Sequence, residues 1–311
     1  MEPRPEETET APIQMAFLGP PGTYGEQAAQ AFASAYHYPI DLVPCSTITD
    51  VYNHSAPLIA LPLENTLQGS VLETLDSLLS VLNSTSVASP SDRTPQRSII
   101  KDLVLPIRHC LVGLKGTIMS HIAFVRSHEQ ALGQSAHFLR KYLPNAKLEK
   151  WSSTAGAAVS LLQKDSEQTG AAICSKAVVS LYPNELEVLC EGTQYGTENY
   201  TRFLLLAANS WLPSPHIIQP TNGLAEYSAF YAISSPSLSP FLSTTSWRMK
   251  TIHSRPAAEG ISYANDKFPK WYLVETLEMG AGRQMETQYG KESNEVLVLG
   301  RVRQEVENKY L

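Results

Sequence analysis

Short apolar runs alternate with amphipathic stretches along the first two thirds of the chain. The strand-like runs cover residues 13–18, 57–63, 103–113, 121–125, 147–151 and 170–174. The helix-like stretches cover residues 26–36, 69–82, 129–142 and 154–164. In the second of these, apolar side chains recur on one helical face at Val71, Leu72, Leu75, Leu78 and Leu79. This alternation predicts an α/β layer structure.

The pattern changes after residue 208. A polar, proline-containing segment at 209–222 predicts a linker, and strand-like runs dominate beyond it. These runs cover residues 227–234, 271–279 and 295–302. The change predicts two domains, an α/β unit over 13–208 and a small α+β unit over 223–311. Residues 1–12 are expected to be disordered, and the Ser/Thr/Pro-rich segment 84–98 is expected to be a surface insertion.

Composition narrows the class of protein. The chain has 311 residues, of which 43% are hydrophobic and 17% charged, as in ordinary globular proteins. The net charge is −6 and the basic residues are dispersed, which argues against a nucleic-acid partner. No apolar run approaches the length of a membrane span. The acidic start resembles neither a secretory signal nor a transit peptide, so we expect a cytoplasmic protein.

The four cysteines support the same expectation. Cys45, Cys110, Cys174 and Cys190 lie far apart and form no CxxC pair. We interpret them as reduced thiols, with a zinc site or a disulfide framework as the alternative. The sequence suggests no redox cofactor and no metal.

A Gly/Pro-rich bend joins the first predicted strand to the first predicted helix. It lacks the lysine of a phosphate-binding P-loop and the spacing of a dinucleotide fingerprint. Free backbone N–H groups at a helix start attract anions of any kind, and Thr23 and Tyr24 can add hydroxyl donors. The alternative is a tight turn that binds nothing.

Polar side chains also follow a buried strand at residues 64–66. Glu64, Asn65 and Thr66 offer an acid, an amide and a hydroxyl at the strand end, where ligands collect in open α/β sheets. The alternative is helix capping by Asn65 or Thr66, which needs no ligand.

Two further strand-to-helix junctions carry hydroxyl groups. One holds Ser127 and Gln134, and the other holds Ser153 and Thr154. Ser127 and His128 are adjacent, so their side chains point apart and do not form a nucleophile–base pair. Taken alone, Ser127 is best interpreted as a helix cap.

The last polar stretch leads into an apolar run that begins at Leu204. Thr201 and Arg202 stand at the start of the predicted strand, followed by Phe203. A guanidinium is suited to bidentate binding of a carboxylate.

In order and spacing, these stretches together resemble the prephenate dehydratase family over roughly residues 13–208. That family has a GPxGTYS-like start, then P-x-ENS-x-x-G, SHPQ-x-x-x-Q, DTA-x-A and N-x-TRF. The corresponding stretches are Gly19–Tyr24, Pro62–Gly69, Ser127–Gln134, Ser153–Ala158 and Asn199–Phe203. The chain departs from the pattern at Gly25, Thr66, Glu129 and Ser153.

The resemblance implies a two-lobed catalytic unit of the type II periplasmic-binding-protein kind. Lobe one would span about 13–105 and 188–208, and lobe two about 106–187. The active cleft would lie between the lobes, where motifs from both converge. The tail would be an ACT-like, ferredoxin-like regulatory domain, and the protein a homodimer or higher homo-oligomer. Because few residues precede the first strand, we expect a monofunctional enzyme without a fused chorismate mutase domain.

The activity implied is the decarboxylating dehydration of prephenate to phenylpyruvate in L-phenylalanine biosynthesis, a lyase reaction without cofactor or metal. The family assigns the hydroxyl-donor role to the threonine at Thr201, and our candidates beside it are Glu64 as partner acid and Asn65. The expected substrate-binding residues are Thr23, Tyr24, Thr66, Ser127, Gln134, Ser153, Thr154, Arg202 and Phe203. The alternatives are the same chemistry on arogenate, and a non-catalytic two-lobed sensor of small carboxylates.

The tail resembles the family's phenylalanine-binding regulatory region only in part. Residues His253, Ser254, Arg255 and Pro256 are similar to its ESRP stretch, with histidine in place of glutamate. The nearest counterpart of its PGAL stretch holds Pro236 and Leu238 but lacks the glycine. These departures argue against L-phenylalanine as an effector.

Overall fold

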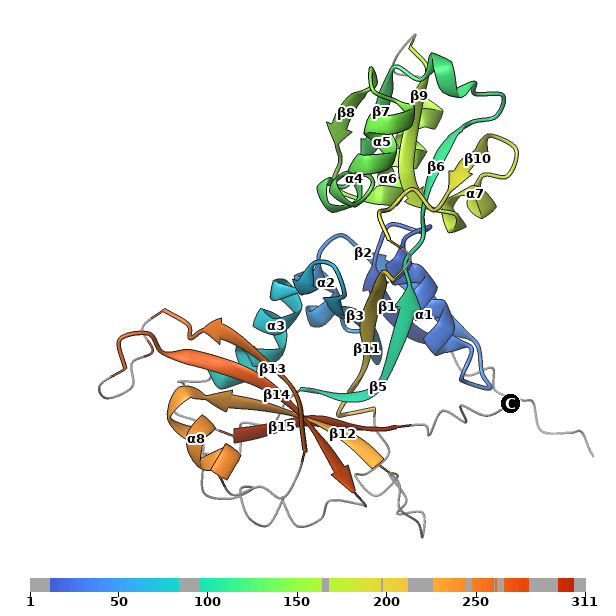
Figure 1. Cartoon of the computed structure of the whole chain (residues 1–311). Coiled ribbons are helices and arrows are strands. Elements are labelled where there is room, and N and C mark those ends of the chain that lie inside the picture. The colour runs from blue at the N-terminus through green and yellow to red at the C-terminus, as the bar shows by residue number, and fades with distance from the viewer. Residues whose placement is uncertain are drawn as a thin grey trace, which may run out of the picture.

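The computed structural model shows two α/β lobes, stacked one above the other, and a tail domain beside the lower lobe (Figure 1). It describes residues 12–83, 96–163, 168–196, 198–211, 226–243, 248–259, 261, 266–279 and 296–304. Residues 1–11 of the predicted disordered start, most of the predicted linker and residues 84–95 of the predicted insertion lie outside these ranges. Within them, no helix is both long and apolar enough to cross a bilayer.

Lobe one is a sheet covered by helices on both faces. Its strands are β1 (Ile13–Leu18), β2 (Ile40–Cys45), β3 (Leu58–Asn65), β4 (Gly69–Ser70), β5 (Arg97–Pro106) and β11 (Tyr200–Ala208). Its helices are α1 (Tyr24–Ala33), α2 (Ile48–Asn53) and α3 (Leu72–Leu79), followed by a 3-10 turn over Ser80–Asn83. Side-chain alternation along β1 places Met15 and Phe17 in the core under α1 and Ala16 in the core under α2 and α3.

Lobe two is a smaller α/β layer. Its strands are β6 (His109–Leu114), β7 (Phe124–Ser127), β8 (Lys147–Lys150), β9 (Gly170–Ser175) and β10 (Leu186–Glu191), in the order β10-β6-β9-β7-β8. Its helices are α4 (Glu129–Gln134), α5 (Ala136–Tyr142), α6 (Thr154–Ser160) and α7 (Ala177–Leu181). Short 3-10 turns cover Met119–His121 and Leu161–Gln163. The expected two-lobed α/β architecture is confirmed.

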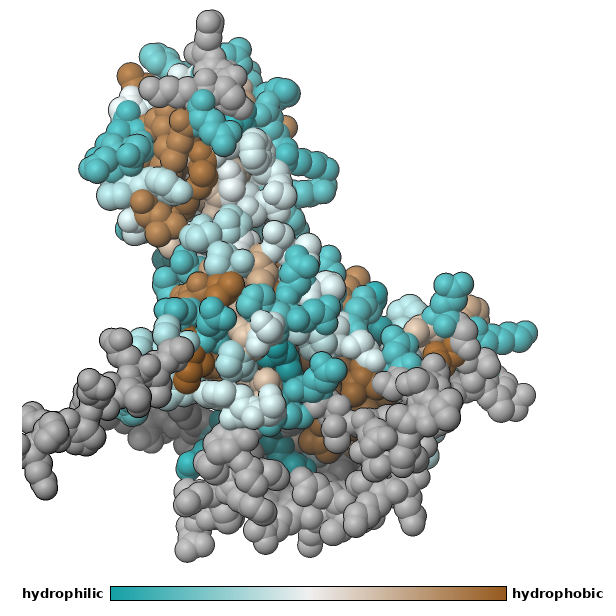
Figure 2. All heavy atoms as spheres, turned by 180° about the vertical axis from the view of Figure 1, so that it is seen from behind, coloured by the Kyte–Doolittle hydropathy of each residue, from teal (hydrophilic) through white to brown (hydrophobic). Residues whose placement is uncertain are grey.

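Two chain segments connect the lobes. The first is Ile107–Arg108, between β5 and β6, and the second runs from Gly192 to Asn199, between β10 and β11. Figure 2 shows this division from behind, with the upper lobe joined to the rest through a narrower waist. The return was expected near residue 188, but β10 continues its pairing with β6 through Glu191. Lobe two therefore extends a few residues further than predicted.

The tail contains β12 (Glu226–Ser234), α8 (Ser235–Ser243), β13 (Arg248–Pro256), β14 (Lys270–Met279) and β15 (Val296–Arg303). Its strands pair antiparallel in the order β13-β14-β12-β15, and the β12-α8-β13 connection is a crossover, in agreement with the expected α+β unit. The tail sheet also joins the sheet of lobe one where Gly300 lies opposite Ile99. Gly300 has φ +152°, and a Cβ there would lie 2.1 Å from the Ile99 carbonyl oxygen, so this close approach requires glycine.

Three predicted elements differ most from the structure, and β2, α2, α7, β10 and β13 were not predicted. The apolar run 103–113 is divided between two sheets, because the chain leaves lobe one at Ile107. The helix expected over 129–142 is split at Ser135, which is buried and whose hydroxyl pairs with that of Thr193 at 2.9 Å. The helix expected from residue 69 begins at Leu72, because Gly69–Ser70 pairs with β3.

Candidate active site

A cleft of about 990 Å³ lies between the two lobes. It is lined by the start of α1, the C-terminal end of β3 and the N-terminal end of β11. The first residues of β6 and residues of α4 and the start of α6 complete the lining. Eight of the twelve side chains predicted for catalysis or substrate binding line it, namely Thr23, Tyr24, Asn65, Gln134, Ser153, Thr154, Thr201 and Phe203. Glu64, Thr66, Ser127 and Arg202 do not line it.

Thr201 and Asn65 meet at the ends of two antiparallel strands. They are direct cross-strand partners in the β11–β3 ladder, although 136 positions separate them in the sequence. The Asn65 Nδ2 donates to Thr201 Oγ1 at 3.0 Å. Two motifs far apart in the sequence therefore meet at one edge of lobe one, where both residues line the cleft.

The orientation of the Asn65 amide is fixed by its neighbours. Its Oδ1 accepts the backbone N–H groups of Leu67 at 2.9 Å and Gln68 at 3.1 Å. The oxygen of the amide therefore faces backbone donors, and its NH₂ group must face Thr201. The same nitrogen lies 2.9 Å from both Asn199 Oδ1 and the Tyr200 carbonyl oxygen.

A chain of hydrogen bonds continues from Asn65 across both lobes. The Asn199 Nδ2 donates to Gln134 Oε1 at 3.0 Å, and His109 Nε2 lies 2.8 Å from the same oxygen. The other ring nitrogen of His109, Nδ1, lies 3.3 Å from the Tyr24 hydroxyl. The Tyr24 hydroxyl donates to the Arg108 carbonyl at 2.7 Å, so the network includes both connecting segments, at Arg108 and at Asn199.

Sequence reasoning assigned no role to His109, although it lines the cleft and is 5% exposed. The only signal was a histidine inside an apolar strand, LPIRHCLVG, which is usually a core residue. Burial lowers the pKa of His109 below 6.5, and the hydrogen bond with Gln134 partly opposes this shift. A neutral imidazole with its proton on Nε2 donates to Gln134 and leaves Nδ1 facing the Tyr24 hydroxyl.

The bend before α1 is a capped helix start. Thr23 Oγ1 accepts the Glu26 N–H at 3.4 Å and donates to the Leu18 carbonyl at 3.1 Å, so its hydroxyl is already engaged. Glu26 reaches back to the Gly22 N–H at 2.6 Å. A Cβ at Gly25 would lie 2.3 Å from the Leu18 carbonyl oxygen, so a side chain at this position would require the backbone to shift.

Lobe two supplies the opposite wall. Ser153 caps α6 by accepting the Gly156 N–H at 3.0 Å, and Thr154 follows it at the first turn. His128 caps α4 through Nδ1, which accepts the Gln130 N–H at 3.4 Å. Among the described residues that line the cleft, none is a lysine or an arginine.

Arg202 does not face the cleft, which corrects the expectation that it grips a substrate carboxylate. Its guanidinium is bound on one side by Asp102 at 2.6 and 2.9 Å and on the other by Glu275 at 2.7 Å. Side chains alternate along β11, so Thr201 and Phe203 face the cleft while Arg202 points away from it.

Three other predicted side chains serve different contacts. Glu64 Oε1 lies 3.4 Å from Arg202 Nη1, on the same side of the sheet. Ser127 is fully buried and donates to the Ile173 carbonyl. Thr66 donates to the Glu198 carbonyl at 3.2 Å and accepts the Tyr200 N–H at 3.0 Å, which fastens the end of β3 to the second connecting segment.

The predicted regulatory residues lie on α8 and β13. Pro236 and Leu238 belong to α8, and residues 253–256 belong to β13. His253 Nδ1 lies 2.8 Å from the Ser70 hydroxyl, and Arg255 forms a bidentate pair with Asp76 at 2.5 and 2.7 Å. This strand is therefore bound to the chain's own lobe one.

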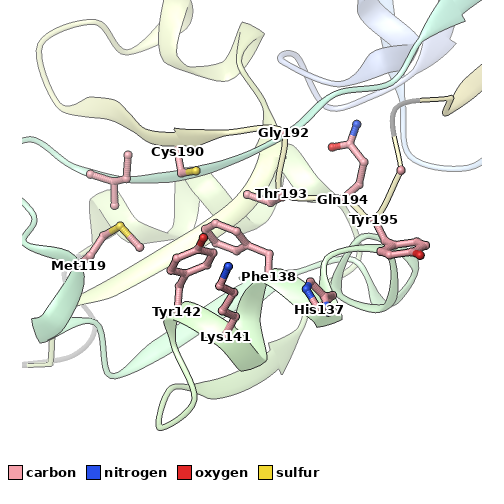
Figure 3. Close-up of a pocket in the computed structure, with 12 residues that line it drawn as sticks. Met119, His137, Phe138, Lys141, Tyr142, Cys190, Gly192, Thr193, Gln194 and Tyr195 are labelled. Atoms are coloured by element: carbon pink, nitrogen blue, oxygen red, sulfur yellow. The ribbon is translucent and has the colours of Figure 1, made fainter.

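A second, smaller hollow of about 520 Å³ lies on lobe two. Figure 3 shows Phe138, Lys141 and Tyr142 projecting from α5 toward the strand that carries Cys190. None of the predicted catalytic or substrate-binding residues lines this hollow. The interlobe cleft is therefore the candidate active site.

Comparison with known proteins agrees with the sequence motifs. The prephenate dehydratase family model matches residues 15–210. Arogenate dehydratase 5 of Arabidopsis thaliana is 32% identical over 206 residues, which are 65% of this chain and 43% of that protein. The bifunctional chorismate mutase/prephenate dehydratase of Aquifex aeolicus is 32% identical over 207 residues, 65% of this chain and 51% of that protein. The chain thus spans about half the length of these curated relatives.

The fold also has solved counterparts. The crystal structure of a prephenate dehydratase from Arthrobacter aurescens, in complex with L-Phe, superposes with a TM-score of 0.71 over 94% of this chain and 90% of that one. At 23% identity this likeness concerns the fold alone. Since the family model matches well over half of its length, the chain belongs to the prephenate dehydratase family.

Proposed function

We propose that the chain converts prephenate to phenylpyruvate, carbon dioxide and water. The observation that carries this proposal is the hydrogen bond from Asn65 to the Thr201 oxygen, inside a cleft built from both lobes. Family membership supports the same reaction. The chain is then a carbon–oxygen lyase of phenylalanine biosynthesis.

Thr201 is suited to assist the departure of the substrate hydroxyl. Its oxygen accepts a hydrogen bond from the Asn65 NH₂ group, so its own O–H remains free to donate into the cleft. As the ring carbon–oxygen bond breaks, the electron pair of the carbon–carboxylate bond enters the ring, carbon dioxide leaves and the ring becomes aromatic. The hydrogen bond from Thr201 stabilises the negative charge that develops on the departing hydroxide, which takes up a proton from the solvent and leaves as water.

Backbone N–H groups and neutral side chains would hold the dianionic substrate. The start of α1 faces the cleft with the positive end of its helix dipole, and Thr154 and Gln134 contribute polar groups from lobe two. Arg202 is excluded from this task by its three carboxylate partners. A weakly cationic site leaves the reacting carboxylate poorly stabilised, which favours loss of carbon dioxide.

Arogenate is the alternative substrate, because it differs from prephenate only by an amino group in place of the keto group. A relative from Arabidopsis thaliana bears that activity in its name.

The test is turnover by the purified full-length protein. Prephenate and arogenate are incubated separately with it, and phenylpyruvate or phenylalanine is followed by ultraviolet absorbance against a protein-free blank. We expect phenylpyruvate from prephenate. Turnover of arogenate alone would identify arogenate, in place of prephenate, as the substrate. Binding of prephenate without any product would identify a carboxylate sensor and contradict the proposal.

The stability of the fold is expected to depend on pH through His109. Burial lowers the pKa of the folded His109 below 6.5, whereas the unfolded chain keeps an ordinary value near 6.5. Below pH 6.5 the unfolded chain therefore binds a proton that the folded chain does not, so the free energy of unfolding falls as pH falls toward the folded pKa. Above pH 6.5 this contribution is fully present and constant.

Urea unfolding of the wild type and of His109→Gln across about pH 5 to 8 measures this contribution. The difference in unfolding free energy between the two proteins should shrink as the pH falls below about 6.5. A difference that stays constant over the whole range would show that His109 does not titrate on unfolding.

We propose that the tail is ACT-like and not controlled by L-phenylalanine. His253 and Arg255 of the ESRP-like stretch already bind Ser70 and Asp76 of the same chain. Among the described strands, β13 pairs with β14 alone, which leaves an edge through which a second copy could extend the sheet into a homodimer.

A further inference from the structure

A buried ion cluster joins the catalytic strand β11 to the tail. Arg202 lies at its centre, and its two Nη atoms are each 2.7 Å from one oxygen of the Glu275 carboxylate on β14. On the other side, Arg202 Nε and Nη2 donate to Asp102 Oδ2. Glu275 is 1% exposed and Arg202 is 7% exposed, so both charges are removed from water.

The Glu275 carboxylate is held on both oxygens by the tail as well. Lys250 Nζ lies 2.9 Å from Oε1, and the Thr251 hydroxyl donates to Oε2 at 3.2 Å. Burial by itself would raise the pKa of Glu275, but the hydrogen bonds and charges of Arg202 and Lys250 outweigh it and hold that pKa at about 2. Glu275 is therefore negatively charged, and it binds the Arg202 guanidinium from the side of the tail.

The backbone of β11 links the position of Arg202 to that of Thr201. The two residues are adjacent in β11, and their side chains leave opposite faces of the strand. Immediately after Arg202 the pairing of β11 with β3 changes register, from Arg202 opposite Glu64 to Phe203 opposite Pro62. The extra residue of this bulge, Leu63, lies on β3, and β11 pairs with β5 in an unbroken register from Tyr200 to Leu205.

We propose that Glu275 is a positioning residue for the reaction at Thr201. By clamping the Arg202 guanidinium from the tail side, it holds the first residues of β11 so that the Thr201 oxygen stays 3.0 Å from Asn65 Nδ2. The inference rests on the proposed function and deepens it. The tail sheet then supports catalysis directly, independently of any effector.

The first test is the steady-state kinetics of full-length Glu275→Gln on prephenate. The change keeps the shape and removes the charge, so it should loosen Arg202 without creating a cavity. We expect kcat to fall about 10- to 100-fold, the range for a small displacement of a reacting group, while KM stays within about threefold. KM should be nearly unchanged because Glu275 does not line the cleft.

A matched control removes a different ion pair between the tail and lobe one. Arg255 and Asp76 form that pair, and Asp76 is half exposed on α3 and forms no ion pair with Arg202 or Glu275 among the described residues. Asp76→Asn should leave kcat within about twofold of the wild type. Thermal melts of both variants fix an assay temperature at which all proteins are folded.

A double-mutant cycle distinguishes an effect of Glu275 on the position of Thr201 from a general effect on the stability of the fold. If Glu275 acts through Thr201, then adding Glu275→Gln to Thr201→Val should change kcat by less than about threefold, because the group that it positions is gone. If Glu275→Gln does not fold at the assay temperature, Glu275→Asp, which keeps the charge and shortens its reach, is used in the same cycle.

The outcomes are distinct. A folded Glu275→Gln with wild-type kcat, or an equal loss in the presence and absence of the Thr201 hydroxyl, would overturn the positioning role and leave the proposed function intact. A wild type that converts neither prephenate nor arogenate would overturn the proposed function, and this inference with it.

Discussion

Replacing Thr201 by valine is expected to lower kcat about 10²- to 10⁴-fold, the range for a positioned acid–base group. Valine matches threonine in shape, so the β11–β3 ladder should survive, but the O–H that faces the cleft is lost. The Asn65 NH₂ group keeps two other acceptors, Asn199 Oδ1 and the Tyr200 carbonyl, and is not left unpaired. The measurement is kcat and KM on prephenate.

A threonine outside the cleft provides the control. Thr49 is exposed on α2, and Thr49→Val makes the same chemical change away from the proposed site. That variant should retain kcat within about twofold. A loss of less than threefold in Thr201→Val would remove Thr201 from the chemistry.

Asn65→Asp is expected to lower kcat about 10²- to 10³-fold, similar to the loss of one donor to a developing oxyanion. The aspartate can still accept the backbone N–H groups of Leu67 and Gln68 through one oxygen. Its other oxygen replaces a donor to Thr201, so the threonine O–H should turn toward the carboxylate and away from the substrate. The new charge should also raise KM for a dianion.

The kinetics of Asn65→Asp can be checked against Asn53→Asp, a change at an exposed position at the end of α2. Asn53→Asp adds the same charge outside the cleft and should behave as the wild type. If Asn65→Asp kept kcat and raised KM alone, the amide would serve only in binding and would not orient Thr201.

The sequence predicted most of the strands and helices but missed β2, α2, α7, β10 and β13, and it did not predict which strands pair. Periodicity placed the strands that end at Asn65 and begin near Thr201, and the family motifs marked both residues. The pairing of β3 with β11 brings together residues that are 136 positions apart in the sequence. No local sequence pattern predicts that Asn65 lies opposite Thr201.

Arg202 shows where motif reasoning was wrong. The TRF stretch suggested a carboxylate-binding guanidinium, and Arg202 does bind carboxylates, but they belong to Asp102 and Glu275. Neither acid belongs to a family motif: Asp102 lies within β5 and Glu275 within β14. The alternation of side chains along a strand did carry a usable signal, because it forbids Thr201 and Arg202 from facing the same cleft.

Ser127 and His109 show that membership of a motif does not predict which side chain lines the cleft. Ser127 stood in a motif and is fully buried against the Ile173 carbonyl, whereas His109 stood in an apolar run and lines the cleft. Whether a side chain at a strand end faces a cleft depends on which strand lies beside it. That information arises only when the two lobes assemble around their connecting segments.

The central claim is that the Thr201 hydroxyl faces the departing hydroxyl of the substrate in the interlobe cleft. A crystal structure of the full-length Thr201→Val protein with prephenate bound tests it most directly, because the slow variant preserves the substrate. We predict both carboxylates at the helix starts and hydroxyls of the two lobes, and the ring hydroxyl within about 4 Å of the residue 201 side chain. Prephenate bound elsewhere, or with its ring hydroxyl turned away from residue 201, would contradict the account.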